Sequence, residues 1–174
     1  MKTIKNLGLL LLGLFAINAN AQTDKTTTSK IVPEKNYVFV ATTAIPTNSA
    51  DISNVLSKMN GNTAGGSISL NGSNYELKIT PDSVIAYLPY YGRAYTAPMG
   101  NDDGGIKFTS TKFTYESAKT KKGWQVTIAI KDTKDNERLN LNIGANGYAA
   151  LNVSTNTKQS ISFNGYIAER KQKN

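Results

Sequence analysis

Residues 124–131 read WQVTIAIK, and this stretch decides the fold. Apolar side chains occupy positions 124, 126, 128 and 130, and mostly polar side chains lie between them. An alternation with a period of two is typical of a β-strand that has one buried and one solvated face. The sequence therefore predicts a half-buried strand here.

The same alternation recurs on both sides of this stretch, and turn sequences such as Asn71-Gly72 and Pro81-Asp82 separate the repeats. The further strands are expected around Tyr37–Thr43, Ile68–Leu70, Tyr75–Ile79, Val84–Leu88, Ile106–Phe108, Phe113–Tyr115, Leu139–Ile143, Ala149–Val153 and Ile161–Phe163. The pattern predicts an all-β fold, an antiparallel meander that forms a small β-barrel, lipocalin-like in outline, or a two-sheet sandwich. Consecutive hairpins favour the barrel, but a period of two does not separate the two architectures.

One short helix is predicted between the first two strands. Ser49 is a suitable N-cap, and apolar residues follow at 52, 55, 56 and 59 before Asn60-Gly61. The chain then divides into a signal peptide (1–21), a flexible N-terminal tether (22–36), a single β domain (37–168) and a polar tail (169–174). About 150 residues are enough for one core without disulfides.

The N-terminus has the pattern of a secretory signal peptide. Lys2 and Lys5 precede an apolar run over residues 7–17, and Ala19-Asn20-Ala21 supplies a small-x-small cleavage site. A run of this length is too short to cross the roughly 30 Å hydrocarbon core. We therefore expect export and a periplasmic location, or a secreted or peripherally attached form, with no transmembrane span in the mature chain.

Two residue types are absent and limit the chemistry. The chain has no cysteine and no histidine, which excludes disulfides, thiolate nucleophiles, Ser-His-Asp triads and metal sites built on either residue. Asp102 and Asp103 are neighbours, an arrangement that does not suit paired catalytic carboxylates, and the EF-hand spacing is missing. We predict no enzyme activity, no cofactor and no metal site.

The net charge of +8 bears on partners. Nucleic acid is not expected as a partner of an exported protein, so the excess of lysine and arginine indicates a glycan, a lipid surface, an envelope protein, or a solvated surface with no specific anion site. The sequence does not identify the partner or the oligomeric state.

An aromatic loop interrupts the meander between Val84 and Phe113. Pro89 ends a strand, and Gly104-Gly105 allows the chain to turn back. The candidate residues for capping the loop or binding a ligand are Tyr87, Tyr90, Tyr91, Arg93 and Tyr95. Either these tyrosines close one end of the β domain, or their rings and the Arg93 guanidinium line a groove for sugar rings or a planar anion.

Four segments also resemble a known family. They are LPYYGRAYTAPMG, GGIKFTSTKFTYE, GWQVTIAIKDT and NGYAALNVSTNTKQSISFNGYI, and the likeness spans residues 37–167. The chain is similar to the family called domain of unknown function 4251 (DUF4251), small exported proteins of Gram-negative bacteria. The resemblance implies an envelope-associated β domain and brings no activity, substrate or catalytic residue. Members often look like lipoproteins, and the lack of cysteine departs from that pattern, so we expect a chain without a lipid anchor.

Two function hypotheses follow. The first is a non-catalytic binding module for a small apolar or glycan-type ligand at the Tyr/Arg-rich loop. The second is a structural or protein-interaction component of the envelope with no small-molecule ligand. A concave, partly apolar cavity would favour the first hypothesis, and a filled core with a flat exposed aromatic patch would favour the second.

Overall fold

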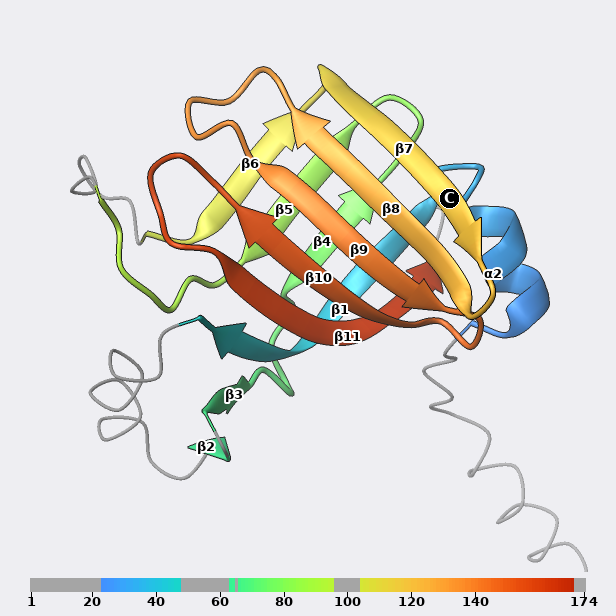
Figure 1. Ribbon diagram of the computed structural model, residues 1–174, viewed down its shortest axis with the longest axis horizontal. Helices are drawn as coiled ribbons and strands as arrows, with labels where there is room; N and C mark the ends of the chain where they lie inside the picture. The colour runs from blue at the N-terminus through green and yellow to red at the C-terminus, as the bar shows by residue number, and fades with distance from the viewer. Residues whose placement is uncertain (1–22, 48–62, 65, 96–103, 171–174) are drawn as a thin grey trace, which may run out of the picture.

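One antiparallel sheet wraps into a nearly closed barrel (Figure 1). The computed structural model describes residues 23–47, 63–64, 66–95 and 104–170. Its strands are β1 (Tyr37–Pro46), β2 (Thr63–Ala64), β3 (Ser67–Ser69), β4 (Glu76–Ile79), β5 (Val84–Leu88), β6 (Ile106–Ser110), β7 (Phe113–Thr120), β8 (Gly123–Ile130), β9 (Arg138–Gly144), β10 (Tyr148–Ser154) and β11 (Ile161–Glu169). The all-β prediction is confirmed, with the barrel as the architecture. The helix predicted after Ser49 lies outside the described residues.

The strand order is β6-β5-β4-β1-β11-β10-β9-β8-β7, with β2 and β3 beside this path. Two meanders, β4 to β6 and β7 to β11, are therefore joined through the N-terminal strand, which pairs with β4 on one side and β11 on the other. Gly165 of β11 lies against β1, where a Cβ atom would overlap the carbonyl oxygen of Val40. Only glycine allows the two backbones to pair at this point.

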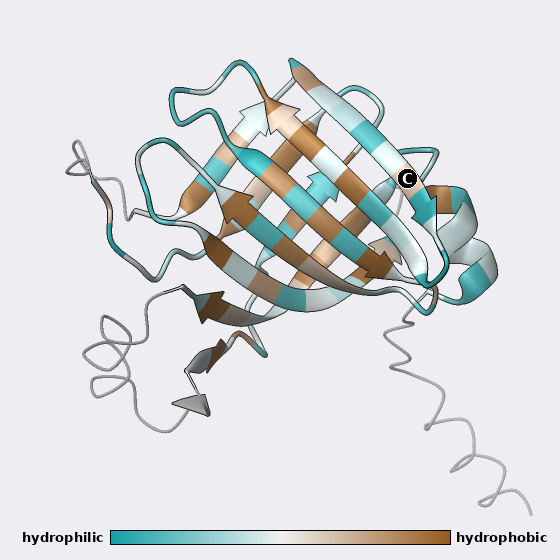
Figure 2. Ribbon diagram, in the orientation of Figure 1, coloured by the Kyte–Doolittle hydropathy of each residue, from teal (hydrophilic) through white to brown (hydrophobic). Residues whose placement is uncertain are grey.

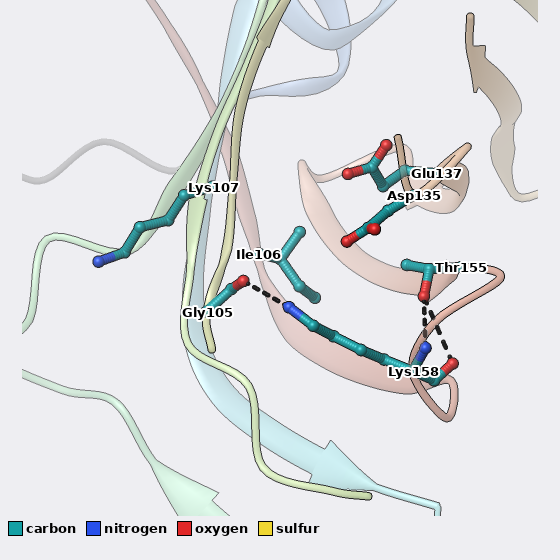
Figure 3. Close-up of a pocket in the computed structure, with 7 residues that line it drawn as sticks. All are labelled: Gly105, Ile106, Lys107, Asp135, Glu137, Thr155 and Lys158. Carbon is teal, nitrogen blue, oxygen red and sulfur yellow. Dashed lines mark hydrogen bonds between the residues drawn. The ribbon is translucent and has the colours of Figure 1, made fainter. Parts of the chain in front are cut away.

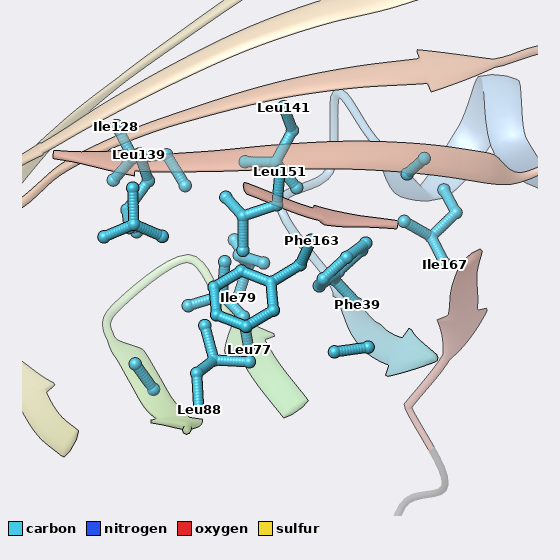
Figure 4. Close-up of a cluster of buried hydrophobic side chains, with 14 of the residues drawn as sticks. Phe39, Leu77, Ile79, Leu88, Ile128, Leu139, Leu141, Leu151, Phe163 and Ile167 are labelled. Carbon is cyan, nitrogen blue, oxygen red and sulfur yellow. The ribbon is translucent and has the colours of Figure 1, made fainter. Parts of the chain in front are cut away.

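The inside of the barrel is a filled apolar core (Figure 4). Along β8 the apolar positions of the sequence alternation are the buried ones. Val126 and Ile128 are fully buried, while Gln125 is exposed. Phe39 and Phe163 place their rings among side chains from the facing strands, and both are fully buried. Figure 2 shows the same banding of apolar and polar residues along β8 to β11.

The barrel is open between β6 and β7, each of which pairs with only one neighbour. At one end of this seam the Asp132 carboxylate accepts hydrogen bonds from the Ser110 hydroxyl and from the backbone N–H groups of Thr111 (2.9 Å) and Lys112 (3.0 Å). The bond from the Ser110 hydroxyl, followed by that from Thr111, lowers the pKa of Asp132. The turn between β6 and β7 is thus tied to the end of β8.

Near the start of β7, an aromatic side chain holds the N-terminal segment. The Tyr115 hydroxyl donates to the Val32 carbonyl oxygen at 2.8 Å and lies 3.2 Å from the Tyr37 hydroxyl. Burial raises the pKa of Tyr115 to about 12, and burial also raises the pKa of Tyr37 well above its ordinary value. Both hydroxyls are therefore neutral at physiological pH.

The segment before β1 is structured, which corrects the predicted flexible tether over residues 22–36. Helix α2 (Lys25–Ile31) begins at Asp24, whose carboxylate accepts from the Thr27 N–H at 2.7 Å. This bond lowers the pKa of Asp24. Ile31 and Val32 enter the core at 3% and 0% exposure, so apolar burial fixes the segment on the barrel. Within the described ranges, no helix is long and apolar enough to cross a membrane.

Candidate functional site

The connection between β5 and β6 docks against the connection between β10 and β11. Ala94 and Lys158 form an isolated antiparallel bridge. The Tyr95 N–H donates to the Thr157 carbonyl oxygen at 2.7 Å, and the Gln159 N–H donates to the Arg93 carbonyl oxygen at 3.0 Å. We call the residues 89–95, 104–105 and 155–160 the loop end of the barrel.

Tyr90 is the centre of the loop end. Its hydroxyl lies within hydrogen-bond distance of two carbonyl oxygens, that of Arg93 at 2.8 Å and that of Gln159 at 3.0 Å. Its ring is half-buried against the core, and this burial raises the pKa of Tyr90. A side chain on Gly92 would crowd the Tyr90 hydroxyl, so the tight turn after it suits glycine.

Lys158 adds a second clamp. Its ammonium nitrogen donates to the carbonyl oxygens of Gly104 and Gly105, both at 2.9 Å, and lies 5.5 Å from the centroid of the Tyr90 ring. Figure 3 shows the lysine side chain reaching across to Gly105. The Lys158 ammonium therefore contacts both ends of the β5–β6 connection. It makes a cation–π contact with Tyr90 at the start and charge-assisted hydrogen bonds with Gly104 and Gly105 at the end.

A polar pocket of about 70 Å³ lies beside this clamp (Figure 3). Its lining residues are Gly105, Ile106, Lys107, Asp135, Glu137, Thr155 and Lys158. Glu137 is 95% buried and accepts a hydrogen bond from the Thr133 hydroxyl. Ligand sites usually enclose about 300–1,000 Å³, whereas one water occupies about 30 Å³. The volume of this pocket is sufficient for a few waters and too small for a sugar ring.

The candidate tyrosines do not all lie on the same surface. Tyr90 and Tyr91 pack partly against the core, and burial raises the pKa of Tyr91. Arg93 and Tyr95 are exposed on the loop end, Tyr95 with 65% of its surface in solvent. Tyr87 lies on the outer face of β5 and is 46% exposed, because the residues before and after it point inward.

Tyr87 instead belongs to an outer cluster that the sequence analysis did not identify. Its ring stacks on that of Tyr75, with 5.6 Å between centroids and 25° between planes. The Lys107 ammonium nitrogen lies 4.9 Å from the Tyr87 centroid. Register explains the contact, since Tyr87 pairs with Lys107 across β5 and β6. We call Tyr75, Tyr87 and Lys107 the tyrosine surface.

Two further features bear on chemistry. A more open cleft of about 180 Å³ lies between α2 and the end of β11, where Arg170 donates to the Asn36 side-chain oxygen at 3.3 Å. Among the described residues, no three His, Cys, Asp or Glu side chains are grouped so that they could hold a metal ion. Asp102 and Asp103 lie outside the described residues, and the absence of a metal site stays a prediction.

The comparisons with known proteins bear on the family and the fold. A family model described as Domain of unknown function (DUF4251) matches residues 19–167. The chain is also similar to a crystal structure of a DUF4251 family protein from Bacteroides eggerthii DSM 20697. That likeness has a TM-score of 0.56 and 10% sequence identity, and covers 87% of this chain and 91% of that chain. A comparison with curated proteins gave no match. The family match covers most of the sequence, and the chain belongs to the DUF4251 family.

Proposed function

We propose that this protein is a non-catalytic binding module of the bacterial envelope that holds a glycan-type ligand on its tyrosine surface. The observation that carries the proposal is the stacked pair Tyr75 and Tyr87 with the Lys107 ammonium beside it. An exposed aromatic ring offers a flat apolar face to the C–H groups of a sugar ring, and its hydroxyl remains available for hydrogen bonds. A neighbouring ammonium adds affinity for a carboxylate or sulfate on the same sugar.

The packing of the core supports a ligand on the outside of the barrel. Fully buried side chains such as Phe39, Leu77 and Phe163 fill the interior between the facing strands. A small apolar ligand inside the barrel would have to displace them, and interiors packed at this density tolerate little added volume. Of the two ligand classes expected from the sequence, the glycan type is the one that suits the outer surface.

The positive charge of the chain agrees with an anionic glycan. The chain has 20 Lys and Arg against 12 Asp and Glu, a balance that attracts polyanions at a distance. We therefore expect binding to a uronic-acid oligosaccharide that weakens as salt is added, because exposed charges are screened within about 8–10 Å at 0.10–0.15 M salt.

The proposed place of action is the periplasm, reached by cleavage after Ala21. The support is the charged, apolar and small-residue pattern of residues 1–21. Intact-mass analysis of the protein from a periplasmic fraction should give a chain that begins at Gln22. Recovery of the full-length chain from the cytoplasm would reject this location.

The alternative is a structural or protein-interaction component of the envelope. The filled core is equally consistent with it, and Ile85, which is 36% exposed on the same strand as Tyr87, adds apolar area to that face. Exposed apolar patches of this kind mark protein contacts as well as ligand sites.

The experiment is calorimetric titration with a hexamer of galacturonic acid. Tyr87→Ala should weaken binding about tenfold, which corresponds to about 1.4 kcal/mol. Lys107→Ala should weaken it and flatten its salt dependence. Tyr148→Ala is the matched control, an exposed tyrosine on β10 that lies away from the tyrosine surface. No binding by the wild type, or equal binding by Tyr87→Ala, would reject the glycan proposal in favour of the alternative.

A further inference from the structure

The outer faces of β8 to β11 carry a regular array of side-chain amides. Because side chains alternate along a strand, the outward positions of these strands follow from the buried ones. The amides are Gln125, Asn140, Asn142, Asn152 and Asn164. We call these five residues the amide face.

Strand register aligns the amide face in two rows across the strands. In one row Gln125 pairs with Asn142, and Ala150 then links Asn142 to Asn164. In the other row Asn140 pairs directly with Asn152. Neighbouring strands lie about 4.7–4.9 Å apart, so a linear polymer that crosses the strands meets donors and acceptors at regular intervals.

The two rows differ in whether their side-chain amides form hydrogen bonds within the sheet. Asn140 accepts from the Thr127 hydroxyl at 3.3 Å, and Asn152 donates to the Ser162 hydroxyl at 3.1 Å, so both are held within the sheet. Gln125, Asn142 and Asn164 are exposed, and their side chains make no hydrogen bond to another described residue. Each of them presents one carbonyl acceptor and one NH₂ donor to solvent.

The amide face is also free of charge. Strand register places two charged residues at its margin, Arg138 at one corner and Glu116 on the edge strand β7. The outer faces of β4 to β6 differ, since Glu76, Lys78 and Lys107 point outward there. In a chain with a net charge of +8, five neighbouring outward side chains without charge are a local departure from the average.

An aromatic pair borders the amide face. Tyr148 on β10 and Tyr166 on β11 are directly paired on the outer surface, one row beyond Ala150. Tyr148 is 58% exposed and Tyr166 is half-buried. Their rings offer the apolar platform on which a sugar ring stacks, next to amides that can pair with its hydroxyls.

We propose that the amide face, bordered by Tyr148 and Tyr166, binds an uncharged polysaccharide chain that lies across β8 to β11. A hydroxyl group is both a donor and an acceptor, as is an amide, and neither partner brings a charge that must be desolvated. Protein interfaces are enriched at their centres in aromatic, Met and Arg side chains, and here the centre has only amides, hydroxyls and Ala150. This chemistry favours a neutral glycan over a protein partner.

This site is separate from the proposed tyrosine surface and has a different ligand class. Binding at the amide face has no charge to be screened, so it should change less than twofold between 50 and 500 mM salt, an expectation that follows from the range of ionic screening. Binding of galacturonic acid hexamer at the tyrosine surface should fall over the same range. The two proposals can therefore fail independently of each other.

The test uses four neutral hexasaccharides, built of β-1,4-glucose, α-1,4-glucose, β-1,3-glucose and β-1,4-mannose, titrated into isotopically labelled protein and followed by NMR. We expect one or more to shift the amide signals of Asn142 and Asn164. The double variant Asn142→Ala/Asn164→Ala should weaken that binding at least tenfold. Its matched control, Asn74→Ala/Asn156→Ala, removes two exposed amides from loops and should bind as the wild type does.

Tyr148→Ala should weaken binding of the neutral hexasaccharide and leave galacturonic acid binding unchanged. Thermal melts of all variants show whether each is folded, since the substituted side chains are exposed. The proposal is overturned if no hexasaccharide binds at millimolar concentration, if the double variant binds as tightly as the wild type, or if sedimentation shows that the face joins two copies of the chain.

Discussion

Removing the Tyr90 hydroxyl tests whether the contacts at the loop end hold the β5–β6 connection in place. In Tyr90→Phe the ring keeps its packing and only the donor is lost. The hydroxyl has one proton to share between the carbonyl oxygens of Arg93 and Gln159, so the change removes one net hydrogen bond. Such a bond contributes about 0.5–1.5 kcal/mol to the free energy of unfolding. For a domain of this size, that lowers the melting temperature by roughly 1–6 °C.

The matched control is Tyr95→Phe in the same connection. Tyr95 is 65% exposed, so loss of its hydroxyl should change the free energy of unfolding by no more than about 0.5 kcal/mol. Urea unfolding measures both variants, and hydrogen exchange should show faster exchange of the Gln159 amide in Tyr90→Phe, because that amide bonds to the Arg93 carbonyl. Equal stability of Tyr90→Phe and the wild type, or an equal loss in the control, would refute the clamp.

The remaining predictions concern the core, the strand pairing and alkaline pH. Ile128→Ala should lower the free energy of unfolding by about 2–5 kcal/mol in urea titration, while Gln125→Ala, exposed on the same strand, should stay within about 0.5 kcal/mol. Gly165→Ala should prevent normal pairing of β1 and β11 and cost about 3 kcal/mol or more, measured by melting or by loss of soluble protein. The folded-state pKa of Tyr115, about 12, lies above its ordinary value of 10, so the neutral form contributes stability that is complete below pH 10 and lost as pH rises to about 12. Urea titrations from pH 8 to 12 should show that loss, reduced in Tyr115→Phe; an identical pH dependence in the two proteins would contradict it.

Period-two alternation was enough to predict which face of each long strand is buried. In β8 and β9 the residues predicted to point inward, such as Ile128 and Leu141, are fully buried. The alternation follows from one physical constraint, the need to bury an apolar face, and that constraint is local. Whether the strands close into a barrel depends on which strands pair, and a period of two is the same in a barrel and in a sandwich.

The N-terminal segment was predicted wrongly because composition outweighed local signals. Thr and Lys account for about half of residues 22–36, a composition that is typical of a flexible tether. Asp24, a good N-cap, and the apolar pair Ile31 and Val32 before Pro33 are the features from which the docked helix was predictable. Burial of two aliphatic side chains in the core stabilises the docked segment even though most of its residues are polar.

The candidate tyrosines show a second limit of sequence reasoning. Their closeness in sequence suggested one cluster. The strand expected and found over Val84–Leu88 directs Tyr87 to the outer surface, whereas Tyr90 belongs to the connection that follows. Lys107 and Tyr75 join Tyr87 only through register across the sheet. Lys158 is far from Tyr90 in sequence, yet its side chain contacts Gly104 at the loop end. No sequence motif marks this contact.

The place of β1 in the barrel has a consequence for how the chain folds. Tyr37, the first residue of β1, pairs with Glu169, the last residue of β11, so the two ends of the domain form one ladder. During synthesis β1 is made first, and one of its edges has no partner until the final strand, β11, has been made. Closing so long a loop is entropically slow, and it couples completion of the fold to completion of the chain. The barrel can therefore close only after the final strand has been made.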